Sequence, residues 1–140
     1  MNRTLGFDLG SKTLGVSVSD PLGMIARALT TLRFDSDDYD SALAQAQALI
    51  REQYADKVVL GLPRHMNGDI GVRGEISIAF KEKLESSGVE VVLWDERLTT
   101  VAANRILLQG DVSRKKRKKV IDQMAAVQIL QSYLDYSNRG

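Results

Sequence analysis

Asp8 is the first residue of the chain whose surroundings suggest chemistry. It lies in residues 4–9, whose alternating apolar side chains predict a β-strand. Aspartate is disfavoured in strands, because a half-buried carboxylate without a partner costs several kcal/mol. Gly6 and Gly10 flank Asp8 on the same side of the strand and leave room for a large ligand beside the carboxylate. The simpler interpretation is an aspartate on an edge strand that faces water.

A second acidic position ends another predicted strand. Residues 89–94 are largely apolar, and Asp95 and Glu96 follow them directly before a predicted helix. Sites in open α/β sheets gather at the carboxyl ends of parallel strands, so an acid here is well placed to join a site. Because side chains alternate along a strand, Asp95 and Glu96 point to opposite faces, and the spacing alone does not choose between them. The simpler interpretation is a turn acid that pairs with Arg97.

The third acidic position, Asp122, opens the last predicted helix. Three, four, seven and eleven residues further on stand Ala125, Ala126, Ile129 and Tyr133. Asp122 therefore heads an apolar stripe rather than a polar face. The two alanines are small enough to let this helix lie close to a sheet. The simpler interpretation is an acid that the helix dipole favours in the first turn.

Together, these positions place one acid in a strand, one at a strand end and one on a packing helix. Three converging carboxylates repel one another unless cations lie between them, and ligand sets made only of oxygen select Mg²⁺ or Mn²⁺. Such a cluster suits hydrolysis of a phosphodiester with two metal ions about 4 Å apart. One ion would activate water and the other would stabilise the leaving oxygen.

A dense cationic run lies just before Asp122. Its six members are Arg114, Lys115, Lys116, Arg117, Lys118 and Lys119. The whole chain has a net charge of only +1, so the rest of it, without these six charges, sums to −5. Consecutive lysines and arginines release condensed counterions when they meet nucleic acid, so we expect a contact with a phosphate backbone; the alternative is a solvated helix face.

Composition and length limit the class of protein. The 140 residues fit one domain, and 44% apolar with 26% charged residues is ordinary for a globular protein. There is no cysteine, so disulfides and thiolate metal sites are excluded and a metal must be held by oxygen or by the single histidine, His65. No apolar run reaches the length of a membrane span and the first residues lack a secretory segment, so we expect a cytoplasmic protein without membrane contact.

The elements that must position these acids alternate in a recognisable order. Strands are predicted over residues 4–9, 14–18, 25–32, 58–62 and 89–94. Helices are predicted to begin at Asp37 or Asp38, near Ile76, at Thr99 or Thr100, and near Val120, the last ending near Tyr136. Tight turns join the first three strands, which predicts antiparallel pairing, whereas the later strand–helix–strand units predict parallel pairing. The fold class is therefore α/β, with a five-stranded mixed sheet flanked by helices.

Five sequence motifs resemble those of the YqgF family, whose members are described as Holliday-junction-resolvase-like proteins and as pre-16S ribosomal RNA nucleases. The motifs are GFDLGSK (residues 6–12), GLP with MNG (61–63 and 66–68), DERLTT (95–100), SRKKRK (113–118) and IDQMAA (121–126). They occur in the same order and span nearly the whole chain. The resemblance implies a ribonuclease H-like fold that covers residues 1–140 as a single nuclease domain.

The resemblance also implies roles for individual residues. It makes Asp8, Glu96 and Asp122 the catalytic acids that hold two Mg²⁺ or Mn²⁺ ions, and so selects Glu96 over Asp95. It further implies that Lys12, Arg97 and the cationic run approach the substrate backbone. The implied function is maturation of the 5′ end of 16S ribosomal RNA in the cytoplasm during ribosome biogenesis. Structured RNA and a pre-ribosomal particle would be the partners of a monomer or homodimer.

Three other functions stay open at this stage. Resolution of a DNA four-way junction would need two sites that face two strands, and the fourth acid of true resolvases is not evident here. An RNA-binding assembly factor without catalysis would explain the cationic run equally well, but it would gain nothing from three repelling carboxylates. An actin-like or sugar-kinase-like protein would share the phosphate-loop character of residues 8–12, but 140 residues leave no room for the second domain that those proteins need.

Overall fold

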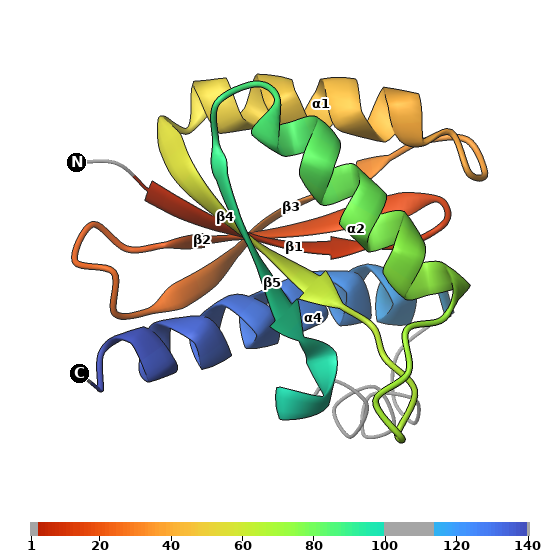
Figure 1. Ribbon diagram of the computed structural model, residues 1–140. Helices are drawn as coiled ribbons and strands as arrows, with labels where there is room; N and C mark the ends of the chain where they lie inside the picture. Colours follow the sequence, from red (N-terminus) through yellow and green to blue (C-terminus); the bar gives the residue numbers. More distant parts are fainter. Residues whose placement is uncertain (1–2, 100–113, 140) are drawn as a thin grey trace.

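The computed structural model describes residues 3–99 and 114–139, and for residues 114–122 it describes only the course of the backbone. In this part of the chain five strands form one sheet, and helices cover both of its faces (Figure 1). None of the described helices combines the length with the apolar character that a membrane span requires.

The sheet confirms the predicted mixed architecture. Its strands are β1 (Arg3–Leu9), β2 (Thr13–Ser19), β3 (Ala26–Arg33), β4 (Ala55–Leu62) and β5 (Glu90–Asp95). Their order in space is β3-β2-β1-β4-β5, which makes β1 the central strand. The first three strands pair antiparallel, whereas β1 with β4 and β4 with β5 pair parallel. The carboxyl ends of β1, β4 and β5 therefore meet at one edge of the sheet.

Two helices cover one face of this sheet and one helix covers the other (Figure 1). The described helices are α1 (Tyr39–Glu52), α2 (Val72–Glu85), the short 3-10 helix η1 (Glu96–Leu98) and α4 (Arg114–Ser137). Asp38 caps α1, because its carboxylate accepts a hydrogen bond of 3.1 Å from the backbone N–H of Ser41. Gly88 follows α2 with φ of 99°, in the left-handed region that glycine adopts without strain, and turns the chain into β5.

The two faces of the sheet are packed differently. On the side of α1 and α2, Leu5, Phe7 and Leu9 of β1 join a large continuous core. On the side of α4, a smaller cluster forms around Ile129 and Leu130. The alternation predicted for β1 is therefore confirmed, and the even-numbered residues of this strand, which include Asp8, lie on the α4 face.

Small residues let α4 approach β1 closely. The Ser17 hydroxyl donates a buried hydrogen bond of 2.7 Å to the backbone carbonyl of Ala126. A Cβ added at Gly6 would lie 2.9 Å from that carbonyl oxygen and 2.7 Å from the Cβ of Leu130. Any larger residue at Gly6 would push the helix away, so glycine on the strand and alanine on the helix fix the distance between the two elements.

The last helix begins earlier than its apolar pattern indicates. α4 starts at Arg114, whereas the pattern predicted a start near Val120. Lysine and arginine are good helix formers and neither glycine nor proline interrupts the cationic run, so the helix extends through it. The helix predicted to begin at Thr99 or Thr100 lies outside the described residues, apart from Thr99 itself.

Candidate active site

Asp8 and Glu96 line the same cleft at the carboxyl edge of the sheet. Asp8 is in the central strand β1, and Glu96 is the first residue of η1, directly after β5. The cleft has a volume of about 230 Å³ and is lined by Asp8, Leu9, Gly10, Thr13, Pro63, Arg73 and Glu96. We call this hollow the acid cleft. It brings together two of the three acids that the resemblance singles out.

Side-chain alternation explains why Glu96, and not Asp95, lines the acid cleft. Val91 and Leu93 of β5 pack into the core under α1 and α2. Trp94 packs against the cluster under α4, on the opposite face. Glu96 is two residues beyond Trp94 and so continues on the α4 face, which is also the face of Asp8. The choice that the spacing alone left open is thus resolved by which face of β5 meets which helix.

Gly61 of β4 provides the space that the Glu96 side chain occupies. A Cβ at Gly61 would lie 2.8 Å from Oε1 of Glu96 and 2.6 Å from Cδ1 of Ile129. Gly61 pairs with Trp94 on the neighbouring strand, and the acid therefore reaches back across β4 towards β1. The glycine is part of the site, because it allows a carboxylate from β5 to lie over the strand that separates β5 from β1.

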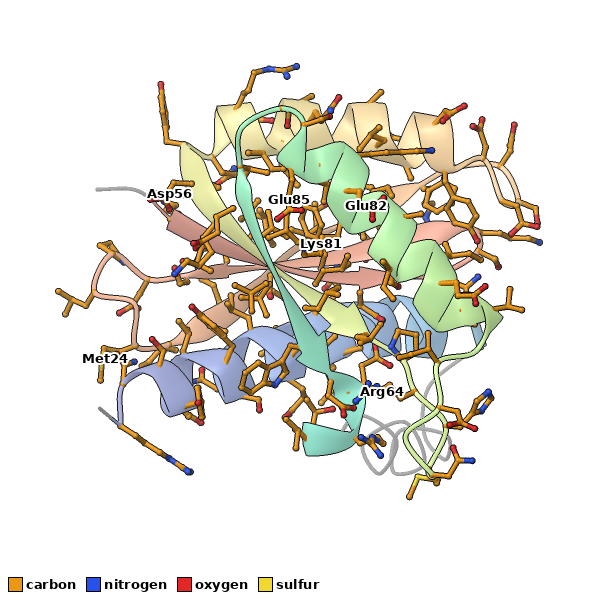
Figure 2. The ribbon with its side chains drawn as sticks, in the orientation of Figure 1. Met24, Asp56, Arg64, Lys81, Glu82 and Glu85 are labelled. Carbon is orange, nitrogen blue, oxygen red and sulfur yellow. The ribbon has the colours of Figure 1, made fainter. Side chains whose placement is uncertain are left out.

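Asp95 has a different role, although it is the neighbour of Glu96 in the chain. Its Oδ2 accepts hydrogen bonds from the Arg97 guanidinium at 2.7 and 3.0 Å, and its Oδ1 accepts one of 2.9 Å from the Arg97 backbone N–H. Figure 2 labels Arg64 in the segment after β4. Its Nη1 atom lies 3.4 Å from the same Oδ2. We call Asp95, Arg97 and Arg64 the arginine clamp. The simpler interpretation of this acid, a turn residue that pairs with Arg97, is confirmed.

The arginine clamp connects two segments that are distant in the chain. The hydrogen bond from the Arg97 side chain holds the pKa of Asp95 below its ordinary value, and the further hydrogen bond from the Arg97 backbone and the Arg64 side chain act in the same direction. Arg97 also donates to the backbone carbonyl of Met66 at 3.3 Å. The clamp therefore ties the segment after β4 to the end of β5, beside the acid cleft.

Arg73 is a residue of the cleft that the sequence interpretation missed. It stands in the first turn of α2, and its guanidinium donates to the backbone carbonyl of Leu9 at 3.1 Å and to the Tyr39 hydroxyl at 2.9 Å. A cation in the first turn of a helix is opposed by the helix dipole, and this was the one signal that the sequence offered. The hydrogen bond to Leu9 anchors the chain immediately after Asp8.

The side chain of Asp122 lies outside the described residues, so its predicted place beside Asp8 and Glu96 stays a prediction. Within the described residues, no group of three acids or histidines is arranged to hold a metal ion. The two acids that are described nevertheless fit a divalent cation. Their donors are oxygen atoms, they share one small hollow, and a Cβ at Gly61 would fill the space that Glu96 needs.

The residues predicted to contact nucleic acid lie around this edge of the sheet to the extent that they are described. Lys12 is exposed in the turn between β1 and β2, two residues beyond Gly10 of the acid cleft. Arg97 is an exposed member of the arginine clamp. The side chains of the cationic run lie outside the described residues. His65 packs over Gly71 and does not line the acid cleft.

Two resolvases are among the solved structures that share this fold. The chain superposes on Thermus thermophilus RuvC in complex with a Holliday junction substrate with a TM-score of 0.70, at 14% identity, over 100% of this chain and 97% of that one. The fowlpox virus Holliday junction resolvase in complex with its substrate gives a TM-score of 0.59 at 14% identity, over 96% and 98% of the two chains. These matches confirm the ribonuclease H-like fold.

Sequence comparison defines the family within that fold. The RuvX family model, described as Holliday junction resolvase, matches residues 2–136. The chain is 53% identical to a Bacillus subtilis protein and 56% identical to a Geobacillus kaustophilus protein, both named "Putative pre-16S rRNA nuclease". These alignments cover 97% and 95% of this chain and 99% and 97% of the relatives. The chain belongs to the RuvX/YqgF family, a family of nucleases that hydrolyse phosphodiester bonds.

Proposed function

We propose that this protein is a metal-dependent endonuclease in which Asp8, Glu96 and Asp122 hold Mg²⁺ or Mn²⁺. The observation that carries the proposal is the acid cleft, where carboxylates from β1 and from the residue after β5 share one hollow. Two carboxylates in one small hollow repel each other, and a cation between them removes this repulsion. Asp122 would complete the ligand set from α4, one helical turn before Ala126.

The protein residues would have separate tasks in this site. When bound, the ions supply Lewis acidity, which activates water and stabilises the leaving oxygen. Asp8 is held in the central strand, and the chain just after it is fixed by the hydrogen bond from Arg73 to Leu9. Gly61 allows Glu96 to reach across β4. The fold therefore positions the ligands before substrate arrives, and this spares the site from reorganising during the reaction.

We propose structured RNA as the substrate, and specifically the 5′ end of pre-16S ribosomal RNA on a pre-ribosomal particle in the cytoplasm. The names of relatives that are more than half identical over nearly the full length support this choice. The cationic run at the start of α4 supplies the charge to hold a phosphate backbone. The resolvase fold and the family description favour a DNA four-way junction as the second candidate.

The decisive experiment compares these substrates directly. Purified protein is incubated with a precursor 16S RNA fragment or with a DNA four-way junction, in Mg²⁺, in Mn²⁺ and in EDTA. We expect metal-dependent cleavage of the RNA, and we expect Asp8→Asn to slow it at least ~100-fold, because one lost ligand removes several kcal/mol of transition-state stabilisation. Equal cleavage by wild type and Asp8→Asn, or no cleavage by either, would contradict the enzymatic proposal.

The other outcomes separate the alternative functions. Cleavage of the junction but not of the RNA would establish a resolvase, and a strictly monomeric protein would argue against it because a resolvase needs two sites. RNA binding that is unaffected by substitution of the acids, with no cleavage in any metal, would indicate a non-catalytic assembly factor.

The role of the cationic run is tested by the salt dependence of RNA binding. Neutralising Lys115 and Lys116 should flatten the slope of log Kd against log salt by roughly one to two units, because two fewer counterions are released. The matched control neutralises Lys81 and Lys83, which belong to α2, the helix on the face of the sheet opposite α4 (Figure 1). An equal change in the control would show that net charge alone is responsible.

A further inference from the structure

A second hollow lies next to the acid cleft. It has a volume of about 410 Å³ and is lined by Pro63, Arg64, His65, Gly71, Val72, Arg73 and Gly74. Pro63 and Arg73 also line the acid cleft, so the two hollows are adjacent and share these side chains. We call it the flanking hollow. A strand of nucleic acid with one phosphodiester in the acid cleft would pass Pro63 and Arg73 to reach it.

The shared residue Arg73 is a cation held in a fixed position. Its guanidinium donates to two uncharged oxygens, the Leu9 carbonyl and the Tyr39 hydroxyl. The Tyr39 hydroxyl in turn donates to Asp37 at 3.1 Å, which fixes the tyrosine. Among the residues that the structure describes, Arg73 forms no ion pair with a carboxylate within 4.0 Å. Its charge is therefore oriented by hydrogen bonds to uncharged oxygens and makes no direct ion pair in the described part of the chain.

The contrast with the arginine clamp gives this observation its meaning. Arg97 and Arg64 form ion pairs with Asp95. These two arginines therefore stabilise the protein. Arg73 stands in the first turn of α2, where the helix dipole disfavours a cation. A guanidinium has five N–H donors in a planar fork, which suits a phosphate. Two of its hydrogen bonds fix the fork, and the cation lines the acid cleft, which an anion can enter from solvent.

We propose that Arg73 binds a phosphate of the substrate strand next to the cleaved bond, and that the adjoining nucleoside lies in the flanking hollow. This inference rests on the proposed nuclease function and names one contact of the same site. The ribose and base would lie against the apolar surface of Pro63 and Val72, with Arg64 at the edge of the hollow. Arg73 thus sets how far the strand advances and which bond lies over Asp8 and Glu96.

The experiment measures binding rather than cleavage, with a short fluorescent single-stranded RNA in Ca²⁺ or EDTA at several salt concentrations. Arg73→Gln should bind about ten-fold more weakly, as expected for a lost hydrogen bond to a charged group. Its slope of log Kd against log salt should fall by about 0.7, the value for one phosphate of a single strand. The matched control is Arg51→Gln, which removes an arginine from the far edge of the sheet; it should change neither quantity.

A second measurement identifies the phosphate itself. One phosphate at a time is replaced by an uncharged methylphosphonate, and each RNA is bound to wild type, Arg73→Gln and Arg73→Lys. At one position of the RNA, replacing the phosphate should weaken binding by wild type but not by Arg73→Gln. The same replacement should still weaken binding by Arg73→Lys, because lysine keeps the positive charge. If Arg73→Gln fails to fold, the comparison of Arg73→Lys with wild type decides, because the lysine cannot reproduce the fork and should be several-fold weaker at that phosphate alone.

The outcomes separate this inference from the proposed function. Arg73 variants that melt at a lower temperature but keep the salt slope and the methylphosphonate profile of wild type would overturn it and leave Arg73 as a structural tie. Expected binding results without any cleavage would sustain the phosphate contact while the endonuclease proposal fails. Cleavage by wild type together with unchanged RNA binding by Arg73→Gln would support the endonuclease proposal and overturn the phosphate contact of Arg73.

Discussion

Asp95 and Glu96 are neighbours in the chain, but the fold assigns them to two regions with different charged neighbours. In the arginine clamp, two guanidinium groups surround the Asp95 carboxylate and lower its pKa. In the acid cleft, Glu96 shares a hollow with a second carboxylate, Asp8. The difference comes from alternation at the end of β5, which sends one acid to each face of the sheet.

This comparison shows how carboxylates at one edge of a sheet are divided between structure and chemistry. An acid whose charge is neutralised by neighbouring arginines attracts a metal ion only weakly, and it contributes to the stability of the fold instead. Two acids that share one small hollow repel each other, and a divalent cation held between them relieves this repulsion. The arginine clamp and the acid cleft should therefore respond to substitution in opposite ways.

The largest effect is expected when Glu96 and its neighbour Asp95 are each replaced by the corresponding amide. Glu96→Gln should slow metal-dependent cleavage at least ~100-fold, and it should leave the melting temperature unchanged or raised in EDTA, because it relieves like-charge crowding with Asp8. Asp95→Asn should slow cleavage less than ten-fold. Single-turnover cleavage and thermal unfolding of both variants measure the two properties.

Each variant serves as the control for the other, since both replace an acid by its amide one residue apart. A lower melting temperature for Glu96→Gln in EDTA would show that the glutamate is structural. If Asp95→Asn slowed cleavage as much as Glu96→Gln, the arginine clamp would be part of the same functional site as the acid cleft.

The next effect sharpens the boundary of the acid cleft. Gly61→Ala places a methyl group 2.8 Å from Glu96 Oε1 and 2.6 Å from Ile129 Cδ1, so the carboxylate or the helix must shift. We expect a loss of about 1–3 kcal/mol of unfolding free energy and a cleavage rate reduced roughly ten-fold or more. Denaturant unfolding and cleavage assays measure these.

The control for this substitution is Gly23→Ala, at a turn position where nothing lies near the added Cβ but where φ is 70°. It should lower stability through backbone strain without affecting cleavage. If Gly61→Ala keeps the cleavage rate of wild type, the position of Glu96 over β4 does not matter for activity.

A smaller effect concerns the stability that the arginine clamp provides. Asp95→Asn removes the ionic partner of Arg97 and Arg64 at a partly exposed site, so we expect the unfolding free energy to fall by about 1 kcal/mol. Arg97→Gln should also lower the unfolding free energy, and the double variant should lose less than the sum of the two single losses, because both substitutions break the same ion pair. Additive losses in this cycle would show that the pair contributes nothing of its own.

The smallest effect is the pH dependence of the same ion pair. The pKa of Asp95 is lower in the folded protein than the ordinary value of 3.8, mainly because of the Arg97 side chain. Its contribution to stability is therefore complete above pH 3.8 and is lost as the pH falls through the folded pKa. The difference in melting temperature between wild type and Asp95→Asn should be constant near neutral pH. It should become smaller as the pH falls below 3.8. A difference that grows on acidification would contradict this sign.

The sequence predicted the strands and their pairing well, because alternation and turn residues are local signals. Leu5, Phe7 and Leu9 showed the buried face of β1, and the tight turns showed the antiparallel start of the sheet. The start of α4 was predicted too late, since an apolar pattern says nothing about helical turns made of basic residues.

The candidate site was only partly predictable for a different reason. Asp8 was found because an aspartate between glycines is unusual in a strand, but Arg73 and Gly61 were not found. Their importance comes from contacts across the sheet, with Leu9 and Tyr39 for the arginine and with Glu96 for the glycine. Such contacts join residues far apart in the chain, and neither composition nor spacing within a segment records them.

The length of α4 has a mechanical consequence. A helix of 24 residues is about 36 Å long, whereas a strand of seven residues spans about 23 Å. Asn138, just beyond the helix, donates to the Gly23 carbonyl in the turn between β2 and β3, and this hydrogen bond ties the carboxyl end of α4 to the sheet. Asp122 and the cationic run thus belong to one continuous helix, which the hydrogen bond from Ser17 to the Ala126 carbonyl fixes to the sheet. A displacement of the first turns of α4 would therefore reach the backbone of Asp122 directly, because neither glycine nor proline interrupts the helix between them.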